Sequence, residues 1–231
     1  MAIVHLVRHG QASFGADDYD ELSVLGVRQS RLLGEWMRER GEVPSRIVIG
    51  PLKRHRQTAV ACLDALGADG RALEVLDDLR ELDHLDILAR HEPRFADAAM
   101  MRAQLATEAN PERAFQAVFV GALQRWVGGR HDDYVESWRA FQQRCRGALA
   151  TMLAPLDAGE SLWVFTSGGP IAAILQQVLE IPDARVLDLT GSLVNSGVTR
   201  LRKSGEGARL DQYNACAHLE RHADGGLITY R

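Results

Sequence analysis

The sequence predicts an α/β protein in which a mostly parallel central sheet lies between two layers of helices. Short apolar, β-branched runs at residues 2–8, 46–49 and 161–165 have the length and composition of buried strands. A polar turn and then a helical pattern follow each run, and such alternation indicates crossover connections in a three-layer α/β/α fold. Ligands bind at the carboxyl ends of the strands in such sheets, so these turns are candidates for a binding site.

The helices between these strands are predicted from their end signals. Ser23 is a suitable N-cap for a helix that runs to about Arg40. The next helix runs through about Leu66, and Pro51 is expected at its first helical position, which proline favours. Another helix is expected directly after residues 166–170, where two glycines and a proline precede an apolar stretch.

The remaining segments are predicted to form a helical insertion and the far side of the sheet. Residues 84–153 carry a helical pattern with breaks near residues 110–111 and 128–129. This pattern favours an insertion of about residues 84–153 within a single domain that spans residues 1–231. Further short strands are expected at residues 72–76 and near residues 185–190, 194–202 and 209–216.

Composition and charge exclude several classes of protein. The chain has 231 residues, of which 46% are hydrophobic and 25% charged, and its net charge of −4 does not favour a nucleic-acid partner. Three cysteines without CxxC spacing argue against a disulfide framework and a zinc site, and they favour a reducing compartment. There is no signal-peptide pattern and no stretch of about 18 apolar residues, so we expect a cytoplasmic protein without membrane partners.

Arg8, His9 and Gly10 follow the first predicted strand and together suit the binding of an oxyanion. A guanidinium group matches phosphate oxygens in two-point contact, and a neutral imidazole can attack phosphorus without a general base. Gly10 would let the backbone come close to a ligand. On these three residues alone, a strand that ends in a solvated Arg–His pair is the simpler explanation.

A second basic segment places Arg54 in the first turn of the helix that begins near Pro51. Helix N-termini favour anions, and Arg54 would add a full positive charge there. Taken alone, Arg54 and Arg56 fit a solvated basic helix face equally well. His55 is expected to point elsewhere on this helix. We predict structural or solvated roles for His5, His55, His91, His131, His218 and His222.

Taken together, three segments resemble the histidine phosphatase superfamily, which includes the cofactor-dependent phosphoglycerate mutases. Residues 6–12, Leu-Val-Arg-His-Gly-Gln-Ala, are similar to its opening signature. Residues 22–30 resemble the helix start that follows, and residues 51–59 resemble its second arginine segment. The order and spacing also fit, so the resemblance covers nearly the whole chain. It implies a reaction that needs no metal and no cofactor.

The resemblance also implies the role of each candidate catalytic residue. His9 becomes phosphorylated during turnover, Arg8 and Arg54 hold the phosphoryl oxygens, and the Glu81 carboxyl protonates the leaving oxygen. Negative charge develops on these oxygens, so fixed cations and a proton donor beside them lower the barrier. By sequence alone, Glu81 is one of several nearby carboxylates, with Asp77, Asp78 and Asp83.

One departure from the family pattern limits the functional interpretation. Ser167 stands where the family has a second catalytic histidine, directly before Gly168 and Gly169. Serine offers a neutral donor in place of a charged one, and loss of one preorganised donor costs on the order of 10²–10³ in rate. Ser167 can still bond a phosphate oxygen, and Gly168 can present its N–H at the following helix start. We therefore expect phosphate contacts from Gly10, Ser13, Ser167 and Gly168.

Three further positions differ from the family or are ambiguous. His84 is the best candidate to replace the second histidine, and its alternative is a surface or capping role at a helix start. Gln11 occupies a place where many relatives have glutamate. Residues 13–16, Ser-Phe-Gly-Ala, lack the asparagine that many relatives place there.

The predicted function is a phosphatase-like hydrolase that acts on a small phosphorylated substrate through phosphohistidine on His9. The first alternative is a regulatory protein of little or no activity that binds a phosphorylated ligand with the same arginines. A lesser alternative is mutase-type phosphotransfer. A serine hydrolase lacks the required glycine two residues before Ser167, and a P-loop motif is missing. The sequence leaves open the identity of the substrate and the oligomeric state, a homodimer among the options.

Overall fold

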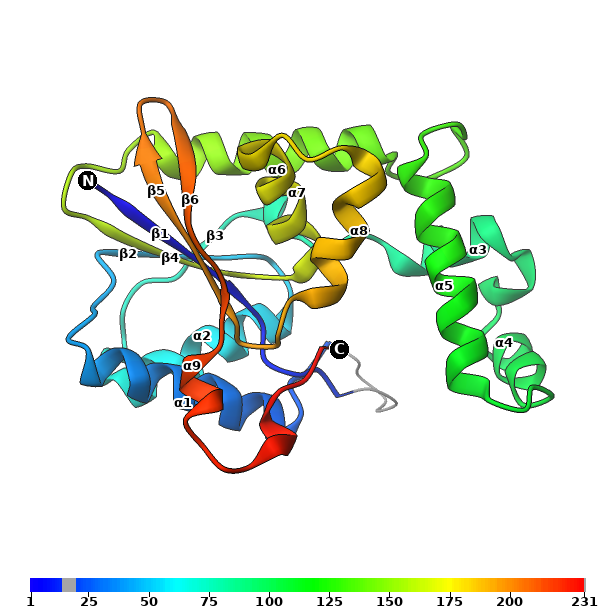
Figure 1. Cartoon of the computed structure of the whole chain (residues 1–231), viewed down its shortest axis with the longest axis horizontal. Coiled ribbons are helices and arrows are strands. Elements are labelled where there is room, and N and C mark those ends of the chain that lie inside the picture. Colours follow the sequence, from blue (N-terminus) through cyan, green and yellow to red (C-terminus); the bar gives the residue numbers. More distant parts are fainter. Residues whose placement is uncertain (14–19, 231) are drawn as a thin grey trace.

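A six-stranded sheet in the order β3-β2-β4-β1-β5-β6 organises residues 1–13 and 20–230, which the computed structural model describes (Figure 1). Strands β1 to β4 are parallel, β5 runs antiparallel to β1, and β6 runs antiparallel to β5, so the sheet is mixed. The predicted α/β class is therefore confirmed. The strands are β1 (Ile3–Arg8), β2 (Arg46–Ile49), β3 (Glu74–Val75), β4 (Ser161–Thr166), β5 (Val198–Ser204) and β6 (Gly207–Ala215).

Strands β1 and β4 lie side by side in the middle of the sheet and are buried on both faces. Continuous apolar sequence is what such central parallel strands require. Their register pairs Val7 with Phe165 and Arg8 with Thr166. The two strands therefore end level with each other, and the residues that follow them emerge as neighbours.

Helices cover both faces of the sheet and give the three predicted layers (Figure 1). Alternate strand residues pack to opposite sides: Val7 and Phe165 lie in the cluster with helices α1 and α2, whereas Leu6 and Val164 lie in the cluster with α6 and α7. This period of two is the geometry of a pleated strand. The covering helices are α1 (Val24–Glu39), α2 (Lys53–Leu66), α6 (Trp138–Leu153), α7 (Gly168–Leu179) and α8 (Asp183–Ser192).

The start of α1 follows its sequence signal, whereas the start of α2 does not. Ser23 caps α1 as predicted, and its hydroxyl accepts a hydrogen bond from the Gly26 N–H at 3.0 Å. The prediction for Pro51 is wrong, because α2 begins at Lys53 and the extended Leu52 occupies its N-cap position without a side-chain cap. Arg54 still lies in the first turn of α2.

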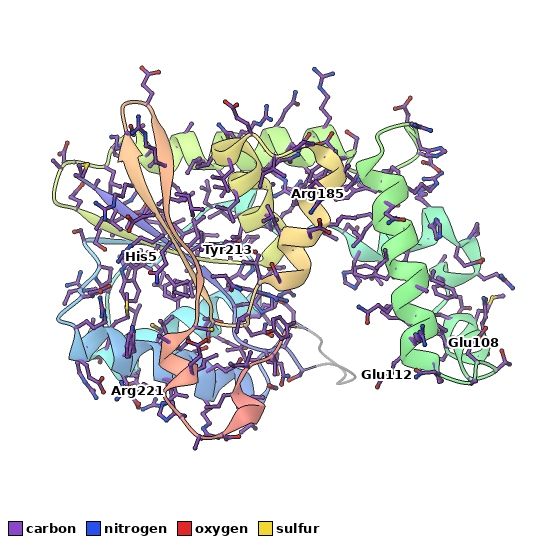
Figure 2. All side chains as sticks on the ribbon, in the orientation of Figure 1. His5, Glu108, Glu112, Arg185, Tyr213 and Arg221 are labelled. Carbon is purple, nitrogen blue, oxygen red and sulfur yellow. The ribbon has the colours of Figure 1, made fainter. Side chains whose placement is uncertain are left out.

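Two of the strands predicted from short apolar runs are wrong or too long. Residues 185–190 belong to helix α8, whose Val186 is buried and whose Leu187 and Leu189 pack against the core. A short apolar run fits a strand and a buried helix equally well, which explains the error. Tyr213 of β6 reaches α8 and donates its hydroxyl to the Leu189 carbonyl at 3.1 Å (Figure 2). Strand β3 is reduced to two exposed residues that pair only with β2.

The first part of the helical stretch predicted at residues 84–153, up to residue 127, projects to one side of the sheet, whereas α6 lies over the sheet (Figure 1). Glu108 and Glu112 lie toward the far end of this projecting part (Figure 2). A buried aromatic cluster joins it to the core: the Trp126 ring lies 5.1 Å from that of Trp138 and 5.3 Å from that of Phe141. The assignment of this stretch as an insertion in one domain stays a prediction. It contains α3 (His84–His91), a 3₁₀ turn (Pro93–Ala96), α4 (Ala98–Leu105) and α5 (Pro111–Val127).

Three short elements complete the described part of the chain. The 3₁₀ turn Asp77–Leu79 follows β3, and helix α9 (Ala217–Glu220) and the 3₁₀ turn Gly225–Leu227 follow β6. Within the described residues, no helix is both long enough and apolar enough to span a membrane.

Candidate active site

The carboxyl ends of β1, β2 and β4 bring the predicted segments together. Arg8 is the last residue of β1, and the next N–H, that of His9, donates to the Thr166 carbonyl at 2.8 Å. At the end of β2, the Gly50 N–H donates to the Phe165 carbonyl at 2.9 Å, which leads the chain into helix α2 and Arg54. The side chains of Arg8, His9 and Arg54 are all buried. Two distant basic segments therefore meet at one edge of the sheet.

His9 is held in one tautomer by its own neighbour. Its Nδ1 lies 2.7 Å from the Gly10 carbonyl oxygen. A carbonyl can only accept, so Nδ1 carries the hydrogen and a neutral ring has its lone pair on Nε2. Burial, together with the positive charges of Arg54 and Arg8, holds the pKa of His9 well below its usual 6.5. His9 is therefore neutral at neutral pH, with an unprotonated Nε2.

The backbone around His9 is fixed from two sides. The His9 carbonyl accepts hydrogen bonds at 3.2 Å from both the Ser196 N–H and the Asn195 side-chain amide. The Gly10 N–H donates to the hydroxyl of Thr58 at 3.0 Å. Thr58 belongs to α2, so this bond joins the segment after β1 to that helix. A Cβ at Gly10 would lie 2.4 Å from the Gly26 carbonyl oxygen. Glycine is required at this position because α1 approaches the end of the strand so closely.

Arg54 and the start of helix α2 together hold a carboxylate. Asp20 Oδ1 accepts from the Arg54 guanidinium at 2.8 Å, and its Oδ2 accepts from the Lys53 backbone N–H at 2.8 Å. Helix N-termini attract anions through their partial positive charge, and the guanidinium adds a full charge. Arg8, by contrast, donates to two uncharged carbonyls, those of Leu193 and Tyr230. Asp20 thus shows that this place accommodates an anionic oxygen.

Glu81 is the acidic side chain that reaches the start of helix α7. Its Oε2 accepts from the Gly169 N–H at 3.3 Å, and a Cβ at Gly169 would lie 2.1 Å from Glu81 Oε1. Gly169 therefore leaves the space in which the carboxyl lies. The neighbouring carboxylates are placed differently: Asp83 caps helix α3, and Asp77 is exposed. The contact with α7 thus distinguishes Glu81 from Asp77 and Asp83.

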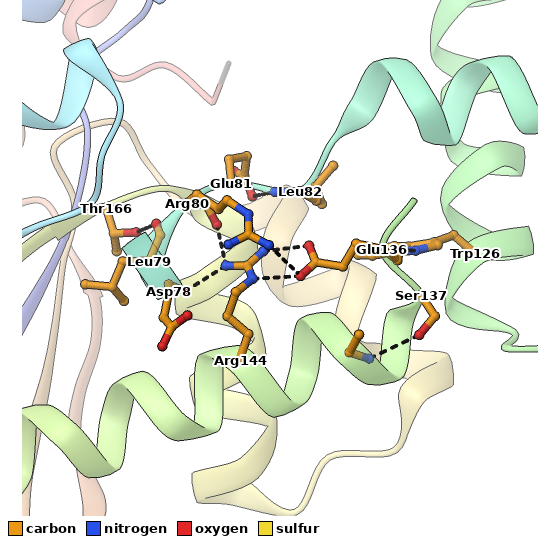
Figure 3. Close-up of polar contacts among 11 residues, drawn as sticks. Asp78, Leu79, Arg80, Glu81, Leu82, Trp126, Glu136, Ser137, Arg144 and Thr166 are labelled. Atoms are coloured by element: carbon orange, nitrogen blue, oxygen red, sulfur yellow. Dashed lines mark hydrogen bonds and ion pairs between the residues drawn. The ribbon is translucent and has the colours of Figure 1, made fainter. Parts of the chain in front are cut away.

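The segment before Glu81 is fixed by several polar contacts (Figure 3). Arg144 of α6 donates to the Asp78 carbonyl at 2.7 Å and to the Arg80 carbonyl at 2.9 Å. The Glu136 carboxylate in turn holds the Arg144 guanidinium at 2.8 Å. From the other side, the Thr166 hydroxyl donates to the Leu79 carbonyl at 2.8 Å. These bonds hold Glu81 at a defined distance from the end of β4.

Ser167 follows β4 and contacts an unexpected partner. It occupies the N-cap position of α7, yet its hydroxyl makes no cap bond. Ser167 Oγ instead lies 2.7 Å from Nε2 of His55, and both residues are fully buried. The His55 ring lies 5.9 Å from the His9 ring, centroid to centroid. Burial and the charge of Arg54 lower the pKa of His55 to about 3, so this second imidazole is also neutral at neutral pH.

The family model described as histidine phosphatase superfamily (branch 1) matches residues 4–216, nearly the whole chain. This chain belongs to the histidine phosphatase superfamily. No match was found among curated proteins. The resemblance of the three sequence segments to this superfamily is thereby confirmed.

Solved structures of similar fold include two phosphatases and a mutase. A phosphoserine phosphatase from Entamoeba histolytica, bound to phosphoserine, is 15% identical with a TM-score of 0.65, and the match covers 95% of this chain and 100% of that one. A phosphoglycerate mutase from Bacillus anthracis is 16% identical with a TM-score of 0.64, covering 94% of each chain. A mycobacterial glucosyl-3-phosphoglycerate phosphatase with inorganic phosphate is 25% identical with a TM-score of 0.64, covering 94% and 98%.

His84 is the residue that the sequence analysis proposed as a replacement for the second catalytic histidine. His84 is the first residue of α3 and is half-buried. Burial lowers its pKa, the negative charges of Asp83 and Glu81 oppose this effect, and the charge of Arg54 adds to it. His84 therefore lies within electrostatic range of Glu81 and Arg54.

Ser13 lies between β1 and α1, outside the named strands and helices. The Ser13 N–H donates to the Glu21 carbonyl at 2.8 Å. Residues 14–16, where the family asparagine is expected, lie outside the described residues. Across the described part of the chain, no three His, Cys, Asp or Glu side chains are grouped so that they could hold a metal ion.

His55 is the residue of the site that the sequence analysis missed. The prediction that it points elsewhere on the helix is wrong, because the first turn of α2 packs against the sheet end with both Arg54 and His55 buried. A signal was present in the sequence. His55 lies four residues before Ala59 and seven before Cys62, both of which face the core, and this spacing defines one helix face. Gly50 makes room for the ring, since its Cβ would lie 2.3 Å from His55 Nδ1.

Proposed function

We propose that this protein is a metal-independent phosphomonoesterase in which His9 Nε2 attacks the phosphorus of a small phosphorylated substrate. The observation that carries the proposal is the bond from His9 Nδ1 to the Gly10 carbonyl at 2.7 Å, which directs the Nε2 lone pair outward. The charges of Arg8 and Arg54 support it, since both lower the pKa of His9 and both suit phosphoryl oxygens.

In the first step, the bond between His9 Nε2 and phosphorus forms while the ester P–O bond breaks. Arg8 and Arg54 bind the phosphoryl oxygens, and Arg54 exchanges part of its contact with Asp20 for the substrate. Gly10, Ser13, Ser167 and the Gly168 N–H complete the proposed phosphate site. These groups act where charge develops, which is the largest source of rate enhancement in such sites.

Glu81 acts as the general acid in the first step and as the general base in the second. Its carboxyl group protonates the leaving alcohol, and the resulting carboxylate then accepts a proton from the water that attacks phosphohistidine. The water breaks the N–P bond and releases inorganic phosphate with neutral His9. The position of Glu81 beside the start of α7 supports this role, because that helix end also favours the phosphoryl charge.

The substrate class is proposed from chemistry and from related structures. A small phosphomonoester fits a site with two arginines and two helix N-termini, and the Entamoeba enzyme holds phosphoserine on the same fold. Three free cysteines support a reducing compartment, and we propose the cytoplasm.

A phosphate-binding protein with little turnover is the second candidate. Ser167 favours it, because a neutral hydroxyl stabilises a transferring phosphoryl group less than an imidazolium does. Mutase-type phosphotransfer shares the first step and has only the fold of the Bacillus mutase in its support.

Hydrolysis of p-nitrophenyl phosphate by wild type and His9→Ala, at high enzyme concentration, tests the proposal. We expect steady release of phosphate from the wild type and a loss of about 10³-fold or more in the variant, since the nucleophile is removed. No hydrolysis by the wild type, together with measurable phosphate binding, would favour the second candidate. Equal rates for the two proteins would contradict both.

A further inference from the structure

His55, and its contact with Ser167, have no part in the mechanism proposed above. Ser167 Oγ and His55 Nε2 are 2.7 Å apart, and neither residue has exposed surface. Serine at an N-cap normally accepts a hydrogen bond from the second or third N–H of its own helix, which stabilises the helix. Ser167 makes no such bond at the start of α7. Its hydroxyl is therefore held in another direction by His55.

The pair lies directly beside the nucleophile. Arg8 and Thr166 are register partners, so His9 and Ser167 are the next residues along two neighbouring parallel strands. The rings of His9 and His55 are 5.9 Å apart with an interplanar angle of 39°. Because Ser167 is fully buried, its hydroxyl can reach only a group that sits within this cluster. A phosphoryl group on His9 would be such a group.

The direction of the hydrogen bond decides what Ser167 can do. A neutral imidazole carries one N–H, and a hydroxyl both donates and accepts. If Nε2 of His55 carries the hydrogen, it donates to Ser167 Oγ and leaves the hydroxyl hydrogen for another acceptor. A donor that itself accepts a hydrogen bond is polarised and donates more strongly, especially in a buried site.

We propose that His55 is a positioning residue whose Nε2–H donates to Ser167 Oγ and so directs the Ser167 hydroxyl to an oxygen of the phosphoryl group on His9. The proposal rests on the proposed function and adds a residue to it. No proton is transferred along these two hydrogen bonds. An imidazole from helix α2 thereby supports the serine that ends β4.

Two variants of His55 separate this role from simple packing. Glutamine can place its amide nitrogen near the position of Nε2, whereas the shorter asparagine reaches only that of Nδ1. We expect the rate of phosphohistidine formation in a single turnover to stay within about threefold of wild type in His55→Gln. In His55→Asn we expect it to fall by about 10- to 100-fold, with KM little changed because Arg8 and Arg54 remain.

A double-mutant cycle tests whether His55 acts through Ser167. Ser167→Ala alone should lower the same rate by about 10- to 100-fold, and adding His55→Asn should lower it by less than about threefold more. Independent losses that multiply would overturn the proposal. A rate equal to wild type in either Ser167→Ala or His55→Asn would also overturn it. If His55→Asn does not fold, His55→Gln and Ser167→Ala decide by these same criteria.

His5→Asn is the matched control for removal of a buried imidazole. His5 is also buried, and its Nδ1 lies 3.5 Å from the Ser161 hydroxyl, but at the opposite end of β1. We expect the single-turnover rate of this variant to equal that of wild type. A loss as large as that of His55→Asn would mean that any buried imidazole has this effect, and it would overturn the specific role of His55.

Measuring the affinity for inorganic phosphate tests this inference independently of the proposed function. If the wild type neither hydrolyses p-nitrophenyl phosphate nor forms phosphohistidine, the proposed function fails. A phosphate affinity about 3- to 10-fold weaker in His55→Asn, but unchanged in His55→Gln, would then still support the hydrogen-bond chain. Equal phosphate affinity and equal rates in all three proteins would overturn it.

Discussion

Strand β1 carries one buried histidine, His5, in its amino-terminal half, and a second, His9, directly follows its carboxyl end. The surroundings of these two histidines differ. Toward the amino end, His5, which is labelled in Figure 2, lies 3.7 Å from the Glu42 carboxylate and 5.6 Å from the Trp163 ring, centroid to centroid. Burial lowers the pKa of His5 to about 4. At the carboxyl end, His9 lies among Arg8, Arg54 and the Gly10 carbonyl, and its pKa is also lowered.

Burial keeps both imidazoles neutral, so burial alone does not make a catalytic histidine. Two features distinguish the carboxyl end. The charges of Arg54 and Arg8 act on His9, whereas the charge of Arg200 on His5 is opposed by Glu42 and Asp211. Helices α2 and α7 also begin there, shortly after β2 and β4. Helices that follow parallel strands always begin at this edge of the sheet, so the polarity of the fold places partial positive charge there. The difference between the ends is therefore electrostatic.

Removal of one arginine should have the largest effect on this contrast. Arg54→Ala is expected to lower kcat/KM by about 10²–10³ because a preorganised cation at the developing phosphoryl charge is lost. Steady-state kinetics with p-nitrophenyl phosphate measures this effect. Arg56→Ala, an exposed arginine on the same helix, is the control and should stay near wild type. Equal losses in both variants would show that general positive charge, and not the site of Arg54, supports the reaction.

Glu81→Gln should have a smaller effect that depends on the leaving group. An alkyl phosphate needs protonation of its leaving oxygen, so its hydrolysis should slow by about 10²-fold. p-Nitrophenolate leaves without that help, and its release should slow by less than about tenfold. Comparison of glycerol phosphate with p-nitrophenyl phosphate checks this. Asp77→Asn, an exposed carboxylate nearby, should change neither rate. The same loss on both substrates would exclude Glu81 as the acid.

The smallest expected effect on catalysis is at the amino end, where His5 should matter for stability only. Its pKa is about 4 in the folded protein and about 6.5 when unfolded. Between these values only the unfolded chain takes up the proton, so the free energy of unfolding falls as pH decreases from 6.5 toward 4. In the wild type, protonation of His5 in the unfolded chain should lower the free energy of unfolding by about 2 kcal/mol between pH 6.5 and pH 5. Urea titrations should show that His5→Gln lacks this part of the decrease. An unchanged loss would contradict the lowered pKa.

The carboxyl-end site was largely predictable because its parts follow from local rules. Apolar runs gave the buried strands, Ser23 gave the start of α1, and the common edge of parallel strands predicted that Arg8 and Arg54 would meet. The sequence did not predict the contact of Asp20 with Arg54, because the geometry of the intervening loop determines it. The position of His55 was missed for a different reason.

Because His55 is adjacent to Arg54 in the sequence, it was expected to point to a different side of the helix. Its spacing to Ala59 and Cys62 nevertheless indicates the core-facing side. Its partner Ser167 lies 112 residues away, and only the pairing of β2 with β4 brings them together. Helix α8 was missed because residues 185–190 hold only three apolar residues, too few to separate a strand from a helix. Long-range contacts and short apolar runs are thus the two places where sequence patterns are insufficient.

The site of phosphorylation tests the contrast between the two ends of β1 most directly. The protein would be mixed with p-nitrophenyl phosphate, quenched in alkali, digested and examined by mass spectrometry. We predict an acid-labile phosphoryl group on the peptide that contains His9, present in wild type and in His5→Asn and missing in His9→Ala. Steady hydrolysis without phosphate on His9, or phosphate on another residue, would contradict the account.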